Sequence, residues 1–376
     1  MKNFLKIAVL SLVLCVTFTG CVWDDKKEGA IHNPISLTMD KWEKGSISPG
    51  KETAGVKYYI IFARRAATHR IYVKMDTVKN LDIYILNSAY EQIGSRNDFD
   101  GDTGRVFYAE WEAEPGKVYY IKAEGSYTNT SGSFWIGYTD FPARPETVFT
   151  DLTQNKWTNG NIVSPNNGGT GEQWFTFVAT EDTQYIYVKF STCTDLDLYI
   201  YDSNYNQIGD RIDAGGYGWV ASQIFSTYRS SLEIGKTYYI KADYGTGNFW
   251  IGFTDFPAAP EAVISPLTEN EWSQGNIKSQ SSGGLGEQWF TFVATDETQY
   301  IFVKFSSCTE LDLYIYDSDL NQIGSRFDAG GYGWEAGQID KASRNLVSGQ
   351  TYYILANNNT GSFWIAFGPD SVAPAP

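Results

Sequence analysis

The chain has 376 residues and a formal net charge of −15 at pH 7, and aromatic residues make up 16% of it. Nucleic acids attract proteins through clustered lysine and arginine side chains. This acidic chain shows no basic stripe, so we do not expect it to bind DNA or RNA.

The first 20 residues have the pattern of a secretory signal. Lys2 and Lys6 precede an apolar stretch at 7–18, which is too short to span a bilayer because spanning needs about 20 apolar residues. The segment Phe-Thr-Gly-Cys that ends at Cys21 resembles a bacterial lipobox, which implies that the cysteine is acylated, with palmitate among the acyl chains. We expect a signal peptide at 1–20 and a lipid anchor on Cys21; the alternative is an ordinary signal with an incidental cysteine.

After a polar tether at 21–34, the sequence repeats itself at long intervals. Trp42, Trp157 and Trp272 are 115 residues apart. Solenoid repeats have periods of roughly 20–50 residues, whereas about 115 residues is the size of a small domain. We therefore expect three tandem domains, at 35–145, 146–260 and 261–370.

Each repeat contains short segments in which apolar and polar residues alternate. In the second repeat, Ile186, Val188 and Phe190 share one face of a segment, and the other face has Tyr185, Tyr187 and Lys189. This period of two predicts half-buried strands, and the segments are separated by turns rich in Gly, Asn and Asp. The sequence therefore predicts an all-β protein of three tandem antiparallel β-sandwich, jelly-roll-like domains.

One further pattern resembles a known family. Each repeat has the order W..G.I, then QWFTFVAT, YIYVKF, DLDLYIYD, G.TYYIKA and G.FWI, most clearly in the second copy. This order resembles the bacterial pre-peptidase C-terminal domain, and the resemblance covers almost all of each repeat, although the first copy fits least well. The resemblance implies a β-sandwich that serves as a non-catalytic accessory module of exported proteins.

Carboxylates recur around the strand DLDLYIYD and predict either a calcium site or solvated strand and turn residues. Calcium is bound by six to eight oxygen atoms, often from carboxylates. In the first repeat, three aspartates alternate in the segment 97–104, which resembles part of a calcium loop. The candidate calcium ligands are Asp98, Asp100, Asp102, Asp197, Asp202, Asp213, Asp312, Asp317 and Asp328.

The segment AGGYGW occurs in the second and third repeats and is absent from the first. It contains Tyr217 and Trp219 in one copy and Tyr332 and Trp334 in the other. Aromatic side chains on loops commonly contact sugars or protein partners. We expect these four residues to bind a ligand, and the alternative is that the tryptophans fold back onto the sandwich.

The sequence offers little support for catalysis. The chain has two histidines, His32 and His69, so the second and third repeats cannot hold a Ser-His-Asp triad. It also lacks the HExxH and G-x-S-x-G motifs, and a hydrolase based on two carboxylates is the least favoured of the three interpretations.

The favoured interpretation is a non-catalytic lipoprotein of the bacterial cell envelope, at the outer membrane or cell surface. We expect the N-terminal lipid to attach the protein to a membrane. The repeated modules would bind a glycan or an extracellular protein. If the acidic residues hold a metal, calcium is the expected cofactor. The alternative is a structural spacer or assembly factor of the envelope with no soluble ligand.

Overall fold

The computed structural model describes residues 29–50, 53–165 and 169–375. The predicted signal peptide and Cys21 lie outside the described residues. Within those residues the regular structure is almost entirely β-strand, and no α-helix occurs. In the part of the chain that is described, no helix is long and apolar enough to span a membrane.

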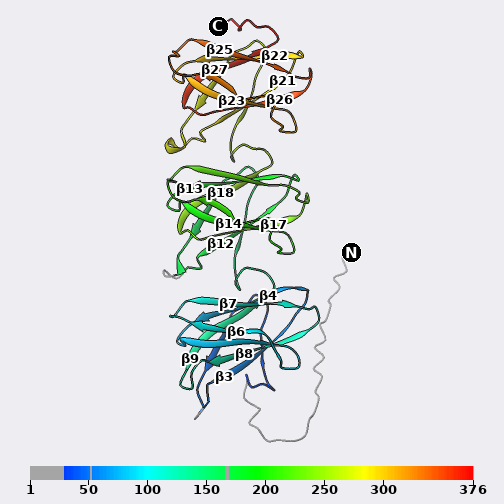
Figure 1. Cartoon of the computed structure of the whole chain (residues 1–376), viewed down its shortest axis with the longest axis vertical. Helices are drawn as coiled ribbons and strands as arrows, with labels where there is room; N and C mark the ends of the chain where they lie inside the picture. Colours follow the sequence, from blue (N-terminus) through cyan, green and yellow to red (C-terminus); the bar gives the residue numbers. More distant parts are fainter. Residues whose placement is uncertain (1–28, 51–52, 166–168, 376) are drawn as a thin grey trace, which may run out of the picture. The chain divides into compact units, whose positions relative to one another are not determined.

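Repeat 1 consists of nine strands in two sheets (Figure 1). One sheet has the order β1-β3-β8-β5-β6 and the other has the order β2-β9-β4-β7. The strands are β1 (Ile35–Ser36), β2 (Glu43–Ile47), β3 (Val56–Phe62), β4 (Ala67–Met75), β5 (Asn80–Leu86), β6 (Gln92–Asp100), β7 (Val106–Ala113), β8 (Val118–Gly125) and β9 (Gly132–Thr139).

Repeat 2 has the same arrangement, with sheets β10-β12-β17-β14-β15 and β11-β18-β13-β16. Its strands are β10 (Phe149–Asp151), β11 (Thr158–Ile162), β12 (Glu172–Val178), β13 (Gln184–Phe190), β14 (Asp195–Tyr201), β15 (Ile212–Gly215), β16 (Ile224–Arg229), β17 (Thr237–Asp243) and β18 (Gly247–Thr254).

Repeat 3 follows with sheets β19-β21-β26-β23-β24 and β20-β27-β22-β25. Its elements are β19 (Ile264–Pro266), β20 (Ser273–Ile277), the 3-10 turn η2 (Gln280–Ser282), β21 (Gln288–Val293), β22 (Thr298–Phe305), β23 (Glu310–Tyr316), β24 (Phe327–Gly330), β25 (Ile339–Asn345), β26 (Thr351–Asn357) and β27 (Gly361–Gly368).

The strand pairing is that of a jelly roll. In repeat 1, β5 pairs with β6, β4 with β7, β3 with β8 and β2 with β9, so the chain forms one long hairpin that wraps into two sheets. The other repeats pair in the same way. The predicted fold class is therefore confirmed, with one added detail: the short first strand of each repeat pairs in parallel with its neighbour.

The cores contain the residues that the alternating pattern selects, but Tyr187, expected on the outer face of β13, is buried as well. Ile186, Val188 and Phe190 are buried, and an edge-to-face pair of Phe175 and Phe249 joins the two sheets with ring centroids 6.0 Å apart. Aromatic side chains bury large apolar areas, so the buried phenylalanines contribute strongly to the stability of the sandwich.

Trp174 is a buried residue that alternation alone does not reveal. It lies on the face of β12 opposite Phe175, yet only 1% of its surface is exposed. The Phe149 ring contacts it at a centroid distance of 5.9 Å and the Tyr201 ring at 5.4 Å. An aromatic layer therefore covers part of the outer face of this sheet.

The packing of the chain defines two compact units, with the boundary between Glu146 and Thr147. The first contains repeat 1, and the second contains repeats 2 and 3. Each of the three predicted domain ranges includes one pair of sheets. Independent folding of each range stays a prediction.

Candidate functional site

In every repeat, an arginine lies between two aspartates, and all of these aspartates except Asp82 are among the predicted calcium ligands. We call these groups the acid–arginine triplets: Asp82–Arg96–Asp98, Asp197–Arg211–Asp213 and Asp312–Arg326–Asp328. The two aspartates of each triplet are directly opposite each other on neighbouring antiparallel strands. Like charges in that position repel, so a cation between them stabilises the pair.

In the triplet of repeat 2, the arginine contacts both carboxylate oxygens of the buried aspartate. Arg211 Nη1 lies 2.8 Å from Asp197 Oδ1 and 2.7 Å from Oδ2, and its Nη2 lies 3.8 Å from Asp213. Asp197 is 5% exposed although it is on the outer face of the sheet. The hydrogen bonds and charge of Asp197 raise the pKa of Arg211.

The other two triplets have the same geometry with different distances. Arg326 Nη1 lies 2.6 Å from Asp312 and its Nη2 3.2 Å from Asp328. In repeat 1, Arg96 lies 3.2 Å from Asp82 and 3.5 Å from Asp98. Burial raises the pKa of Asp82, whereas a hydrogen bond from Ser126 and the charge of Arg96 oppose that shift.

These arginines recur at the same 115-residue spacing but were not among the predicted site residues. The sequence feature that could have revealed them is their place two residues before the second aspartate of each pair. A guanidinium in this place supplies the positive charge that calcium was expected to supply.

The remaining acidic candidates occupy separate places. Asp202 and Asp317 each accept backbone N–H groups of their own turns, from Asn204 and Asn206 in one case and from Asp319 and Asn321 in the other. Such bonds hold the turns between strands. The carboxylates of Asp202 and Asp317 are therefore already hydrogen-bonded within their own turns.

The first half of the segment 97–104, expected as part of a calcium loop, is the end of a strand. Asp98 and Asp100 belong to β6, and Asp102, 97% exposed in its side chain, follows in the turn, with Lys79 Nζ at 3.9 Å. No group of three metal-ligating side chains gathers anywhere among the described residues. Calcium binding therefore stays a prediction that this geometry does not support.

The predicted aromatic loops are hydrogen-bonded turns in which the tyrosine and the tryptophan lie in different surroundings. In repeat 2, Trp219 N–H donates to the Gly216 carbonyl at 3.1 Å, and Gly218 at the third position has φ +90°. A positive φ at that position is typical of a type II turn, which glycine adopts without strain. Tyr217 is at the tip and fully exposed.

Trp219 folds beneath the turn, as the alternative interpretation proposed. Its ring contacts Phe190 at a centroid distance of 5.2 Å, nearly perpendicular, and Phe225 at 6.1 Å. Repeat 3 has the same geometry: Tyr332 is fully exposed, and Trp334 contacts Phe305 at 5.3 Å. The structure thus leaves the tyrosines free to meet a ligand and assigns the tryptophans to packing.

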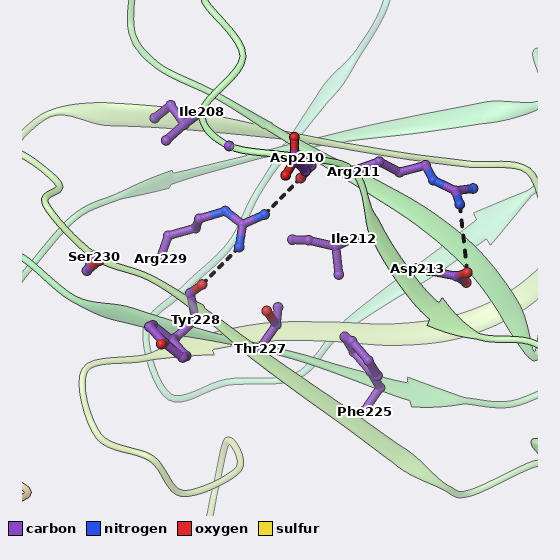
Figure 2. Close-up of a pocket in the computed structure, with 11 residues that line it drawn as sticks. Ile208, Asp210, Arg211, Ile212, Asp213, Phe225, Thr227, Tyr228, Arg229 and Ser230 are labelled. Atoms are coloured by element: carbon purple, nitrogen blue, oxygen red, sulfur yellow. Dashed lines mark hydrogen bonds and ion pairs between the residues drawn. The ribbon is translucent and has the colours of Figure 1, made fainter.

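A groove of about 670 Å³ opens in repeat 2 between the segment 208–213 and strand β16 (Figure 2). Ile212 lies between the two sides of the groove, and Arg229 extends from β16 across to the other side. Arg229 Nη2 donates to the Asp210 carbonyl and Nη1 to the Tyr228 carbonyl, each at 3.0 Å. The groove therefore has fixed walls.

The aromatic turn connects the two strands that border this groove. Phe225 lines the groove and also contacts Trp219, so the base of the turn forms one end of the groove wall. Arg211 and Asp213 of the acid–arginine triplet line it as well. The aromatic turn, the acid–arginine triplet and the groove are thus continuous along one edge of the sandwich.

Comparisons with known proteins do not identify a family. No protein-family model matches the chain, and no curated protein matches it significantly. A triple jelly-roll structure from a study of turret assembly in an archaeal virus is 13% identical, with 89% of this chain and 92% of that chain covered and a TM-score of 0.20.

Two further structures show weaker likeness. Tripeptidyl peptidase 2 is 7% identical over 87% of this chain and 33% of that chain, with a TM-score of 0.16. The CUB1-EGF-CUB2 region of human MASP-1/3 is 12% identical over 54% of this chain and 99% of that chain, also with a TM-score of 0.16. These scores are too low to support a conclusion about function.

Proposed function

We propose that the protein is a non-catalytic binding module of the bacterial cell envelope whose repeats 2 and 3 bind a glycan or an extracellular protein. The observation that supports this function best is the pair of matching turns that present Tyr217 and Tyr332 fully to solvent. Tyrosine is enriched among residues that dominate binding energy, because it offers a large amphipathic surface with few rotatable bonds.

The turn geometry supports a binding role because it holds the backbone of each tyrosine in place before any ligand arrives. The packed tryptophan and the backbone hydrogen bond from Gly216 N–H to the Thr194 carbonyl, at 2.9 Å, anchor the turn of repeat 2. Preorganised groups lose less conformational entropy when they bind. Two such sites in one chain also allow a polymeric ligand to bind both at once.

The other parts of the proposal rest on the sequence. We infer export from the signal at 1–20 and membrane anchoring from the lipobox at Cys21, which agrees with the resemblance to accessory domains of exported proteins. A Cys21→Ser variant is expected to leave the membrane fraction or to stay unprocessed. Normal processing and membrane association of this variant would contradict the anchor.

The proposed function is tested by screening the chain without residues 1–20 on glycan and matrix-protein arrays, with and without calcium. For each ligand found, Tyr217→Ala and Tyr332→Ala are expected to raise Kd about tenfold or more, which corresponds to about 1.4 kcal/mol. Tyr244→Ala is the matched control, because Tyr244 is 73% exposed but lies outside the turns.

A structural spacer is the second candidate function, and the joint within the second compact unit favours it. The Phe256 ring packs on Trp289 and Tyr353 at centroid distances of 4.8 and 4.9 Å, and Ala259 N–H donates to Glu287 Oε1 at 3.4 Å. Such packing restricts movement between repeats 2 and 3. A chain that binds no array ligand, with or without calcium, would favour the spacer over the binding module.

A further inference from the structure

The groove of repeat 2 combines an apolar floor with polar walls. Ile212, 7% exposed, and Phe225 provide the apolar part, and Thr227 adds a hydroxyl beside them. A volume of about 670 Å³ lies within the range of about 300–1,000 Å³ that is typical of ligand clefts. Mixed linings of this kind suit ligands that have both apolar faces and hydroxyl groups.

The charges that line the groove balance. Asp210 and Asp213 face Arg211 and Arg229, and both arginines already have acceptors within repeat 2. The chain as a whole carries a charge of −15, which repels anionic polymers. The electrostatics therefore favour a neutral ligand.

An extended peptide fits this edge less well than a saccharide. A peptide strand would need the outward-facing N–H and C=O groups of β16. The Ile224 N–H donates to Gln280 Oε1 at 3.1 Å, and the Tyr228 carbonyl accepts from Arg229 Nη1. Side chains thus occupy both ends of the strand edge, as proteins commonly arrange to prevent strand addition.

We propose that the groove between the segment 208–213 and β16 binds a neutral saccharide segment. In this arrangement Phe225 and Ile212 contact the C–H face of a sugar ring. Thr227, Asp213 and Arg211 form hydrogen bonds with its hydroxyl groups. The proposal goes beyond the proposed function, because it does not depend on the tyrosines at the turn tips.

Repeat 3 provides an internal control, because different residues occupy the equivalent positions. The register of β22 with β25 matches that of β13 with β16. In this register, Asp340 occupies the position of Phe225, and Ala342 occupies that of Thr227. Ser325 corresponds to Asp210, because it follows the equivalent turn. The Asp340 carboxylate accepts the N–H groups of Gly330 at 3.0 Å and Lys341 at 2.8 Å.

The test is calorimetric titration of the chain without residues 1–20 with cellohexaose, mannohexaose, xylohexaose and chitohexaose. At least one of these neutral oligosaccharides is expected to bind at one groove site per chain. The triple variant Asp210→Ser, Phe225→Asp, Thr227→Ala is expected to abolish this site. We expect the variant to fold, because repeat 3 has the same three residues at the equivalent positions. Thr227→Ala alone removes one hydroxyl and is expected to raise Kd about threefold to tenfold.

The reverse exchange, Ser325→Asp, Asp340→Phe, Ala342→Thr, is expected to raise the number of groove sites from one to two. The double variant Tyr217→Ala, Tyr332→Ala retains groove binding, which separates this proposal from the function of the turn tips. The proposal is overturned if none of the four oligosaccharides binds, or if the triple variant binds as the wild type does. Tighter binding of a heparin hexasaccharide or of an extended peptide in the groove would also overturn it.

Discussion

Repeat 1 and repeat 2 share one strand order but differ along one edge of the sandwich. In repeat 1, β6 runs for nine residues, Gln92–Asp100, and pairs along most of β5. In repeat 2, the corresponding β15 has four residues, Ile212–Gly215, and the aromatic turn and groove adjoin it. The paired sheets and their triplets are common to both, so the variable edge is where binding features are expected to differ.

A single cross-strand pair illustrates the difference. In repeat 2, Gln184 is opposite Arg229, which bridges the groove. In repeat 1, His69 and Trp111 occupy this pair, both are buried, and their rings lie 5.5 Å apart. Repeat 1 has thus replaced a polar bridge with an aromatic core contact.

The largest expected effect concerns a feature that both repeats share. Arg211→Met leaves the buried Asp197 without its cation, and we expect the melting temperature of repeat 2 to fall by several degrees. Calorimetry measures the change. Lys79→Met is the control, because both Lys79 and its partner Asp102 are largely exposed and exposed pairs contribute little.

The same experiment with calcium and with chelator tests the calcium prediction. If the arginines supply the positive charge, millimolar calcium is expected to leave the wild-type melting temperature unchanged. A rise of several degrees in the wild type would show that calcium binds the folded chain and would contradict the role given to the arginines. Such a rise confined to repeat 1 would point to Asp98 and its neighbours, because the contact between Arg96 and its buried aspartate, at 3.2 Å, is the longest of its kind in the three triplets.

A second change makes repeat 1 more like the other repeats. Tyr59 forms the same edge-to-face contact with Phe134 that Phe175 forms in repeat 2, and within the described residues its buried hydroxyl has no hydrogen-bond partner. Tyr59→Phe is expected to raise the free energy of unfolding of repeat 1 by about 1–3 kcal/mol, because an unsatisfied buried polar group is removed. Urea unfolding measures it; a loss of stability would show that the hydroxyl is bonded.

The smallest expected effect is a pH dependence of the stability of repeat 1 that is caused by its buried histidine, His69. Burial lowers the pKa of His69 below its ordinary value of 6.5, although the charge of Asp140 opposes the shift. The unfolded chain therefore binds the proton more tightly, and the stability of repeat 1 falls as the pH drops below about 6.5. His69→Gln, the residue found at position 184, is expected to reduce this slope, as measured by hydrogen exchange in β4.

The fold was largely predictable because strand alternation records which side chains face the core. The residues Ile186, Val188 and Phe190 show this directly, since their spacing and their burial agree. The burial of Trp174 was not predictable, because it depends on Phe149 packing across the outer face of a sheet. Alternation describes two faces of a strand and does not show what covers the outer one.

The candidate site was less predictable, because its geometry depends on strand register. The sequence shows Asp197 and Asp213 but does not show that they are directly opposite each other with Arg211 between them. It also leaves open whether Trp219 points outward, and contacts with distant residues of the sandwich decide this. The groove arises where β15 begins at Ile212, and a strand boundary is hard to read from residue types alone.

The central claim is that the turn tips of repeats 2 and 3 meet the ligand. Hydroxyl-radical footprinting of the chain without residues 1–20, with and without a ligand found on the arrays, tests it by reporting the exposure of each tyrosine side chain. Oxidation of Tyr217 and Tyr332 is expected to fall, while that of Tyr127 and Tyr244, which are also exposed, stays constant. Unchanged oxidation of Tyr217 and Tyr332, or protection confined to repeat 1, would contradict the account.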